Sequence, residues 1–319
     1  MKNQQTKNIF RVMMAICLMT LSACASLPGK QSQNIDGTNY SYARQGTGKV
    51  NVVFVTGLGS VMDSAWGEVF EEVAGFAPVF AYNRPGYGDS ITQTQKNNQA
   101  AQKVAGSVAD MVLPGASLGI DLIRAAARPS ETPEPISGNQ VASQLHRLLN
   151  NAGIKPPYIL VGHSLGGMYI QSFTHAYPHE VAGLVLVDSR PVEMTRLCDE
   201  QIGKGACLPP AMMINLMPDF VQAEYYGMAL TEEQLRKAGP LPNIPVTVLA
   251  STEKQFGVPD GVVALKIKLQ KQDADKLPQG RFIRAEKSGH FIQHDKPELV
   301  VGEIRRMLGR PRANAVSNR

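Results

Sequence analysis

The sequence contains few aromatic residues and a single tryptophan. Phe, Trp and Tyr together make up 6% of the chain, and Trp66 is its only tryptophan. Surfaces that bind single-stranded nucleic acid stack the bases on aromatic rings, and carbohydrate-binding surfaces use such rings in a similar way. The composition therefore argues against both kinds of surface.

A strong positive charge is also missing. The formal charge of the whole chain is +5, and three positive charges, on Lys2, Lys7 and Arg11, lie within residues 1–23, which hold no acidic residue. Without that segment the net charge is +2. A nucleic-acid-binding domain is far more basic and clusters its Lys and Arg on one face. The sequence has no such cluster, so nucleic acid is not an expected partner.

No apolar run is suited to span a bilayer as a permanent anchor. Residues 12–21 are apolar, but a transmembrane helix needs roughly 20 such residues. Residues 104–127 are largely apolar, but they are broken by proline and glycine and hold Asp110 and Asp121. For residues 91–135 we expect either a pair of short helices that pack over the site or a surface excursion without functional weight.

The N-terminus has the pattern of a secretion signal instead. A positively charged segment precedes residues 12–21, and Leu21-Ser-Ala-Cys24 follows them. That tetrapeptide resembles the bacterial lipobox, whose cysteine becomes the lipidated first residue of the mature protein. An ordinary signal peptide that is cleaved nearby, with Cys24 incidental, is the alternative. Because Ala25 rather than aspartate follows the cysteine, the resemblance implies sorting to the outer membrane.

Cysteine is scarce, with four residues in the chain. Cys17 would leave with the signal and Cys24 would carry lipid, so Cys198 and Cys207 remain as an even pair in an exported protein. A disulfide between them is the natural interpretation. A metal site is the alternative, but the sequence between them has no histidine. We therefore expect no metal.

The most informative stretch surrounds Ser164. A short apolar run at residues 158–161 predicts a buried strand, and residues 168–177 predict a helix. Between them, Gly162-His-Ser-Leu-Gly166 fits the pattern G-x-S-x-G, in which a serine sits on a sharp turn between strand and helix. The turn holds the hydroxyl above the sheet, with the Leu165 N–H placed to meet a developing oxyanion. Ser164 is therefore a candidate nucleophile.

The rest of the chain alternates strand and helix patterns from residue 50 to residue 190, which indicates an α/β fold with a mostly parallel sheet covered on both faces. The predicted strands are 31–35, 39–44, 50–55, 78–82, 158–161, 181–187, 244–250 and 281–285. The predicted helices are 137–152, 168–177, 262–269 and 297–308. Between residues 190 and 242 the sequence shows no strand but two amphipathic patches, at 211–217 and 231–238. This indicates a helical cap inserted between strands.

These patterns divide the chain into five parts. We expect a lipoprotein signal peptide at 1–23, a tether at 24–34, an α/β core at 35–190 and 243–310, a helical cap at 191–242 and a tail at 311–319.

A serine hydroxyl needs a neighbouring base, and the base needs an orienting acid. Of the six histidines, His290 follows the last predicted strand in a turn of small residues, which is a suitable position from which to reach Ser164. His163 lies inside the turn and is expected to point away from the serine. The strand at 50–55 ends in a glycine-bracketed turn, in which the Leu58 N–H is a second candidate oxyanion donor.

Taken together, these motifs make the chain resemble an α/β-hydrolase. The motifs are Val55-Thr-Gly-Leu-Gly59, Tyr82-Asn-Arg-Pro-Gly-Tyr-Gly-Asp-Ser90, Val161-Gly-His-Ser-Leu-Gly-Gly167, Leu184-Val-Leu-Val-Asp188 and Ser288-Gly-His-Phe-Ile292, with Lys296-Pro-Glu298 after them. The resemblance covers nearly all of residues 35–310. It implies Ser164 as nucleophile, His290 as base, and the N–H groups of Leu58 and Leu165 as the oxyanion hole. The aspartate nucleophile of haloalkane dehalogenases and epoxide hydrolases is absent, which disfavours both chemistries.

The acid is where the sequence departs from the family pattern. The family usually places it a few residues beyond the strand at 244–250, where Glu253 stands one position early and Asp260 stands late. Some members place it after the preceding strand, and Asp188 matches that position. We expect Asp188 to be the acid, with Glu253 as the alternative.

The sequence thus predicts a lipid-anchored serine hydrolase of the bacterial cell envelope. It would cleave a carboxylic ester in a small-molecule or lipid-like substrate through an acyl-enzyme, without a metal or organic cofactor. An amidase, a peptidase or a thioesterase could use the same residues, and a non-catalytic binding protein could use the same fold.

Overall fold

The structure is a computed structural model that describes residues 26–92, 133–209, 214–215, 217–254, 258–259 and 261–309. The predicted signal peptide, Cys24, the tail at 311–319 and Asp260 lie outside these residues. So do residues 93–132, which make up most of the segment 91–135, and most of the amphipathic patch at 211–217.

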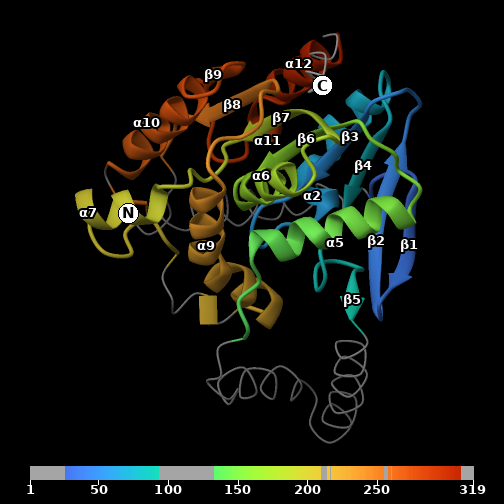
Figure 1. Cartoon of the computed structure of the whole chain (residues 1–319), viewed down its shortest axis with the longest axis horizontal. Coiled ribbons are helices and arrows are strands. Elements are labelled where there is room, and N and C mark those ends of the chain that lie inside the picture. The colour runs from blue at the N-terminus through green and yellow to red at the C-terminus, as the bar shows by residue number, and fades with distance from the viewer. Residues whose placement is uncertain are drawn as a thin grey trace, which may run out of the picture.

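A single twisted sheet organises the described part of the chain (Figure 1). Its strand order is β1-β2-β4-β3-β6-β7-β8-β9, and the short β5 pairs with β2. The strands are β1 (Lys30–Ile35), β2 (Thr38–Gln45), β3 (Asn51–Val55), β4 (Val79–Tyr82), β5 (Ile91–Thr92), β6 (Tyr158–His163), β7 (Val181–Val187), β8 (Val246–Ser251) and β9 (Gly280–Ala285). All neighbours from β4 to β9 are parallel, whereas β1 and β2 form an antiparallel hairpin. The carboxyl ends of the parallel strands therefore meet at one edge.

Helices cover both faces of this sheet (Figure 1). They are α2 (Met62–Ala74), α5 (Gly138–Asn151), α6 (Leu165–Ala176), α7 (Met194–Gln201), α9 (Asp219–Ala238), α10 (Val262–Asp275), α11 (Ile292–Asp295) and α12 (Pro297–Leu308). Alternate residues of β3 show the two layers. Val53 and Val55 pack in the core beneath α5 and α6, and Val52 and Phe54 pack in the core beneath α2 and α12. A strand buried on both faces must be apolar throughout, which is why the β-branched runs predicted these strands.

Sequence patterns predicted most of these elements but missed or shortened some. Helix α2 was missed, although its buried residues, Met62, Ala65, Trp66, Val69, Phe70 and Val73, recur at helical spacing. Helix α9 is one helix of 20 residues, of which the sequence indicated only residues 231–238. Its buried face includes Glu224 and Glu232. Charged residues on the buried face hide the apolar periodicity on which the prediction depended.

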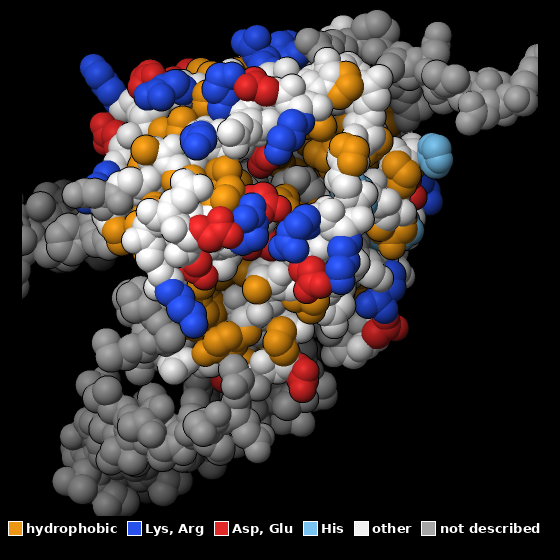
Figure 2. Space-filling view, turned by 60° about the vertical axis from the view of Figure 1, so that its left-hand side comes forward, with side chains coloured by type: hydrophobic (Ala, Val, Ile, Leu, Met, Phe, Trp, Pro, Cys, Tyr) orange, Lys and Arg blue, Asp and Glu red, His pale blue; other side chains and the backbone are white. Residues whose placement is uncertain are grey.

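The region between β7 and β8 carries α7 and α9, and no strand occurs in its described residues. A disulfide joins Cys198 of α7 to Cys207, with the two Cα atoms 6.0 Å apart. Acidic and basic side chains mix on the face where α7, α9 and α10 lie (Figure 2). Arg196 pairs with Glu193 and Glu200 there, and Arg236 pairs with Glu193. Within the described residues, none of the helices combines the length and apolar character needed to cross a membrane.

Candidate active site

Ser164 stands in a strained turn between β6 and α6. Its backbone φ is 53° and its ψ is −120°, a conformation that costs a residue with a Cβ atom of order 1–3 kcal/mol. The Ser164 N–H donates to the carbonyl of Val187 at 3.0 Å, and its carbonyl accepts from the N–H groups of Gly167 and Arg190 at 3.1 and 3.2 Å. These bonds tie the turn to the end of β7 and hold the strained conformation in place.

The predicted glycines make room for this turn. A Cβ atom at Gly162 would lie 2.6 Å from the carbonyl oxygen of Gly166, and one at Gly166 would overlap the carbonyl oxygens of Val55 and Thr56. Larger residues at these positions would push α6 away from β6 and β3. The strand-turn-helix geometry predicted from the G-x-S-x-G pattern is thus a result of close backbone packing.

His290 lies in the loop after β9 and contacts Asp188, which follows β7. The ring Nδ1 of His290 lies 2.6 Å from Asp188 Oδ2. Asp188 also has a positive φ, 42°, and its N–H donates to the carbonyl of Leu249 in β8. His163 and Val187 are paired in the register of β6 and β7, so Ser164 and Asp188 follow adjacent positions at the same edge of the sheet.

Asp188 is held in a cage of donors. Its carboxylate accepts five hydrogen bonds: from His290, from Lys266 Nζ at 2.6 Å, from the N–H and the hydroxyl of Ser251 at 3.0 and 2.8 Å, and from Gln270 Nε2 at 3.2 Å. The residue is only 1% exposed. Burial alone would raise the pKa of Asp188, but the hydrogen bond from His290 and the charge of Lys266 hold it well below its usual value. The carboxylate is therefore ionised at neutral pH.

Lys266 and Gln270 were not predicted from the sequence. They stand four residues apart on α10 and so share one face of the helix. That spacing was visible, but nothing in the sequence indicated that this face would meet the end of β7.

His163 has a contact that the sequence analysis did not anticipate. Its side chain is 1% exposed, and its Nε2 lies 2.9 Å from the backbone carbonyl oxygen of His290. Burial, together with the neighbouring His290, lowers the pKa of His163 to about 3. A neutral ring can donate its Nε2–H to that carbonyl, which ties the loop of His290 to the strand that ends at Ser164.

The two candidate oxyanion donors belong to segments that adjoin the serine. A Cβ atom at Gly57 would lie 3.0 Å from the Cβ of Ser164, so the loop that carries Leu58 abuts the serine. Leu165 is the first residue of α6. In the described part of the chain, neither the Leu58 N–H nor the Leu165 N–H donates to a protein acceptor. Both groups are thus available to an oxygen atom of a ligand.

The contact between Ser164 and His290 that a catalytic triad would use is not formed in this structure. The Ser164 hydroxyl makes no hydrogen bond to His290 among the described residues, an arrangement that is common in sites without a ligand.

Glu253, the alternative acid, is exposed, and its side chain makes no hydrogen bond to any described residue. Its N–H donates to the carbonyl of Ser288. The structure therefore brings Asp188, and not Glu253, to His290.

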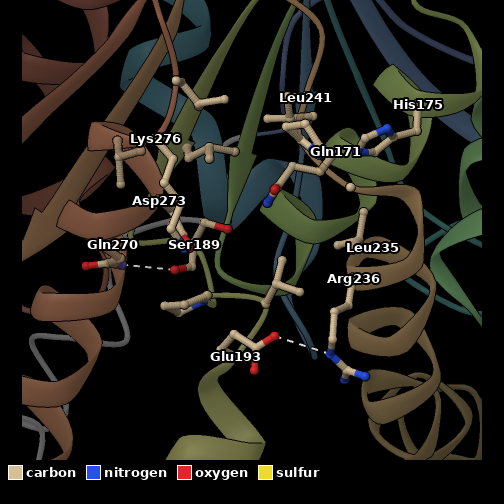
Figure 3. A pocket seen from close by; sticks show the side chains of 17 residues that line it. Gln171, His175, Ser189, Glu193, Leu235, Arg236, Leu241, Gln270, Asp273 and Lys276 are labelled. Carbon is tan, nitrogen blue, oxygen red and sulfur yellow. Dashed lines mark hydrogen bonds and ion pairs between the residues drawn. The ribbon is translucent and has the colours of Figure 1, made fainter.

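A cavity of about 310 Å³ lies beside this cage. Side chains of α6, α9 and α10 surround it, and Gln270 forms part of its wall (Figure 3). Burial raises the pKa of Asp273, on the same wall, to about 6. None of Ser164, Asp188 and His290 lines the cavity. In the described residues, no group of three or more His, Cys, Asp and Glu side chains is arranged to hold a metal ion.

The geometry of the turn, the loop histidine and the buried aspartate agrees with a match to a known family. The model of the alpha/beta hydrolase family matches residues 52–303. The chain belongs to the alpha/beta hydrolase family. The predicted fold class, a mostly parallel sheet with helices on both faces, is confirmed.

This alpha/beta hydrolase has distant relatives. The uncharacterised protein YqjL of Bacillus subtilis is 24% identical over 277 residues, which cover 85% of this chain and 88% of that protein. The structure of a thermophilic esterase from Thermogutta terrifontis has a TM-score of 0.55 at 19% identity and covers 88% of this chain and 97% of its own. The epoxide hydrolase CorEH has a TM-score of 0.54 at 14% identity, with coverages of 88% and 98%. At such identities the structures share the fold alone.

The contact between Lys266 and Asp188 gives a pH-dependent prediction. Because the folded pKa of Asp188 is depressed, its ionised form stabilises the fold above the unfolded pKa of about 4, and this stabilisation is lost progressively as the pH falls from that value through the depressed folded pKa. Lys266→Met removes one charged hydrogen-bond donor and should lower the free energy of unfolding at pH 7 by about 1–3 kcal/mol. Because the folded carboxylate stays ionised well below pH 4, the deficit should shrink only as the pH falls to about 2 and below, as measured by urea unfolding.

Lys271→Met is the matched control, because Lys271 pairs with Asp275 on the exposed face of the same helix. It should change stability by at most about 0.5 kcal/mol. Equal losses in the two variants, or a Lys266→Met deficit of the same size at pH 7 and at about pH 2, would contradict the account.

Proposed function

We propose that this alpha/beta hydrolase is a serine hydrolase that cleaves a carboxylic ester through an acyl-enzyme. The observation that carries the proposal is the 2.6 Å contact between His290 Nδ1 and the buried, ionised Asp188, at the edge of the sheet where the strained Ser164 stands. The roles assigned are nucleophile for Ser164, base for His290, acid for Asp188, and oxyanion donors for the N–H groups of Leu58 and Leu165.

The charge on Asp188 determines which nitrogen of His290 carries the proton. A carboxylate accepts, so Nδ1 must donate, which leaves Nε2 as the unprotonated base. In the first step the Ser164 oxygen attacks the ester carbonyl carbon, and its proton passes to His290 Nε2. The carbonyl oxygen becomes an oxyanion and accepts from the two N–H groups. The bond to the alcohol then breaks, and the leaving oxygen takes the proton from Nε2.

The second half repeats these steps with water. Water attacks the acyl carbon and gives a proton to His290 Nε2, and the Ser164 oxygen recovers that proton as the carboxylic acid leaves. Throughout, the negative charge of Asp188 stabilises the imidazolium that forms in each half. The cage around Asp188 supports this role because it keeps the carboxylate ionised and aimed at Nδ1.

The structural likeness to an esterase agrees with ester cleavage, and an amide or thioester could react by the same steps. The epoxide hydrolase shares the fold, but the turn of this chain carries serine where that chemistry requires aspartate.

We further propose that the mature protein begins at a lipidated Cys24 and is anchored in the outer membrane, on the basis of the Leu21-Ser-Ala-Cys24 pattern.

Replacement of the nucleophile tests the enzyme assignment. Ser164→Ala should abolish hydrolysis of p-nitrophenyl esters and labelling by a fluorophosphonate probe, because no other group would form the acyl-enzyme. Circular dichroism should show an unchanged fold, which controls for misfolding. Turnover by the purified variant well above the uncatalysed rate would contradict the proposal, as would a wild-type protein that binds esters without hydrolysing them.

The acid is tested by a pair of variants. Asp188→Asn should lower kcat on the order of 10⁴-fold, because an amide no longer fixes the tautomer of His290. Glu253→Gln, a change of the same kind at an exposed position, should leave kcat within about twofold. The comparison uses one p-nitrophenyl ester at saturation, and the reverse pattern would assign the acid to Glu253.

The anchor is tested in cells. Cys24→Ser should either release soluble protein or accumulate an unprocessed precursor, because no acyl chain can be attached to the serine in the same way. Fractionation and immunoblotting with wild type in parallel would show either outcome. A processed variant that stays in the membrane fraction would argue against lipidation of Cys24.

A further inference from the structure

A buried ion pair adjoins the loop between β3 and α2, which carries Leu58. Arg84 follows β4, and Glu224 belongs to α9 in the region between β7 and β8. The two side chains are 2% and 4% exposed, and the guanidinium binds both carboxylate oxygens, at 2.5 and 3.0 Å. An ion pair removed from water gains little net stability over apolar residues of similar size. Stability alone therefore does not explain why this ion pair is present.

The remaining donors of Arg84 all point to the loop between β3 and α2. One terminal nitrogen, Nη1, donates to the carbonyl and the hydroxyl of Thr56, both at 2.8 Å. The other, Nη2, donates to the carbonyl of Gly57 at 2.8 Å. The guanidinium thus joins this loop to Glu224, since a planar fork can bind both at once.

The contact with Gly57 controls the direction of a neighbouring donor. The carbonyl of Gly57 and the N–H of Leu58 belong to one planar peptide group, in which they point in opposite directions. When Arg84 holds the carbonyl, the Leu58 N–H is fixed on the other side of the plane. The positive charge also polarises the peptide group, which makes its N–H a stronger donor.

Tyr87 holds the far end of the same loop to the same carboxylate. Its hydroxyl donates to Glu224 Oε2 at 2.7 Å and accepts from the N–H of Gly59 at 3.2 Å. The tyrosine ring also lies against the guanidinium, 4.7 Å from its central carbon. Glu224 is therefore bound to the loop through Arg84 on one side and through Tyr87 on the other.

We propose that Arg84 and Glu224 are positioning residues that aim the Leu58 N–H at the oxyanion, so that helix α9 sets the geometry of the oxyanion hole. This inference rests on the proposed function for its catalytic consequence. Neither residue touches the reacting atoms; both act through the peptide group of Gly57 and Leu58. A ligand that displaced α9 would therefore change kcat more than it changed KM.

The test compares Glu224→Gln with Glu232→Gln. Glu232 is also buried on α9 and paired with an arginine, Arg190, but it makes no contact with the loop at 56–59. Glu224→Gln should lower kcat for a p-nitrophenyl ester by roughly 10- to 100-fold and leave KM within about threefold, because the loss concerns the transition state. It should weaken inhibition by a trifluoromethyl ketone, which forms an oxyanion in the site, by a similar factor. Glu232→Gln should change neither value by more than about threefold.

A second variant separates positioning from stability. Arg84→Met with Glu224→Met removes both charges at once and leaves neither one buried alone, so the protein should stay folded. Its kcat should fall as far as that of Glu224→Gln. A folded double variant with wild-type kcat would overturn the inference, and so would equal losses in Glu224→Gln and Glu232→Gln.

The amide signal of Leu58 gives a readout that does not depend on turnover. In ¹H–¹⁵N spectra it should shift in Glu224→Gln and stay in place in Glu232→Gln. If it shifts as expected while the wild type has no Ser164-dependent activity, the positioning contact stands and the proposed function fails. If it stays in place in Glu224→Gln, the inference fails whatever the activity.

Discussion

A buried carboxylate at the end of β7 is the group on which the rest of the candidate site depends. Removal of Asp188 from water costs several kcal/mol unless donors replace its hydration. Five hydrogen bonds do so, from β8, from α10 and from the loop of His290. The same bonds that make the charge tolerable also bring three separate elements to one point. The position of His290 is therefore a consequence of satisfying this carboxylate.

The serine is placed by a different constraint, the close approach of three backbones. Strand β6, the loop after β3 and the start of α6 meet where only glycine fits, and the strained Ser164 is held by hydrogen bonds to the end of β7. His163 then links this turn to the His290 loop through one hydrogen bond. The turn and the carboxylate cage share the end of β7, so displacement of that strand end would disturb both.

Local sequence patterns predicted the sheet and the serine turn because both depend on local chemistry. Strands such as β3 are apolar on both faces, and the turn at Ser164 needs its small neighbours in the chain. Contacts between distant segments left no such signal. Lys266 and Gln270 are ordinary polar residues of an amphipathic helix, and Glu224 is an acidic residue that interrupts the apolar pattern of α9. Lys266 and Gln270 gain a role only from their contacts with Asp188, and Glu224 gains one only from its contact with Arg84.

The choice of acid illustrates the same limit. In the sequence, Asp188 and Glu253 both follow strands whose carboxyl ends meet at one edge. Chain order therefore favoured Asp188 as the acid but did not exclude Glu253. The structure separates them by burial, since one is enclosed by donors and the other faces solvent. That difference supports the proposed role of Asp188, because a carboxylate held in a fixed position orients a base better than one that faces solvent.

The central claim is that Ser164 is acylated during turnover, and an acyl-enzyme trapped on that residue tests it most directly. p-Nitrophenyl trimethylacetate carries a hindered acyl group that should leave the enzyme slowly. After mixing and acid quench, mass spectrometry of the digested protein should find the added acyl mass on the peptide that contains Ser164, with about one p-nitrophenolate released per enzyme before the steady state. Hydrolysis of the same ester with no adduct on Ser164, or with the adduct on another residue, would contradict the account.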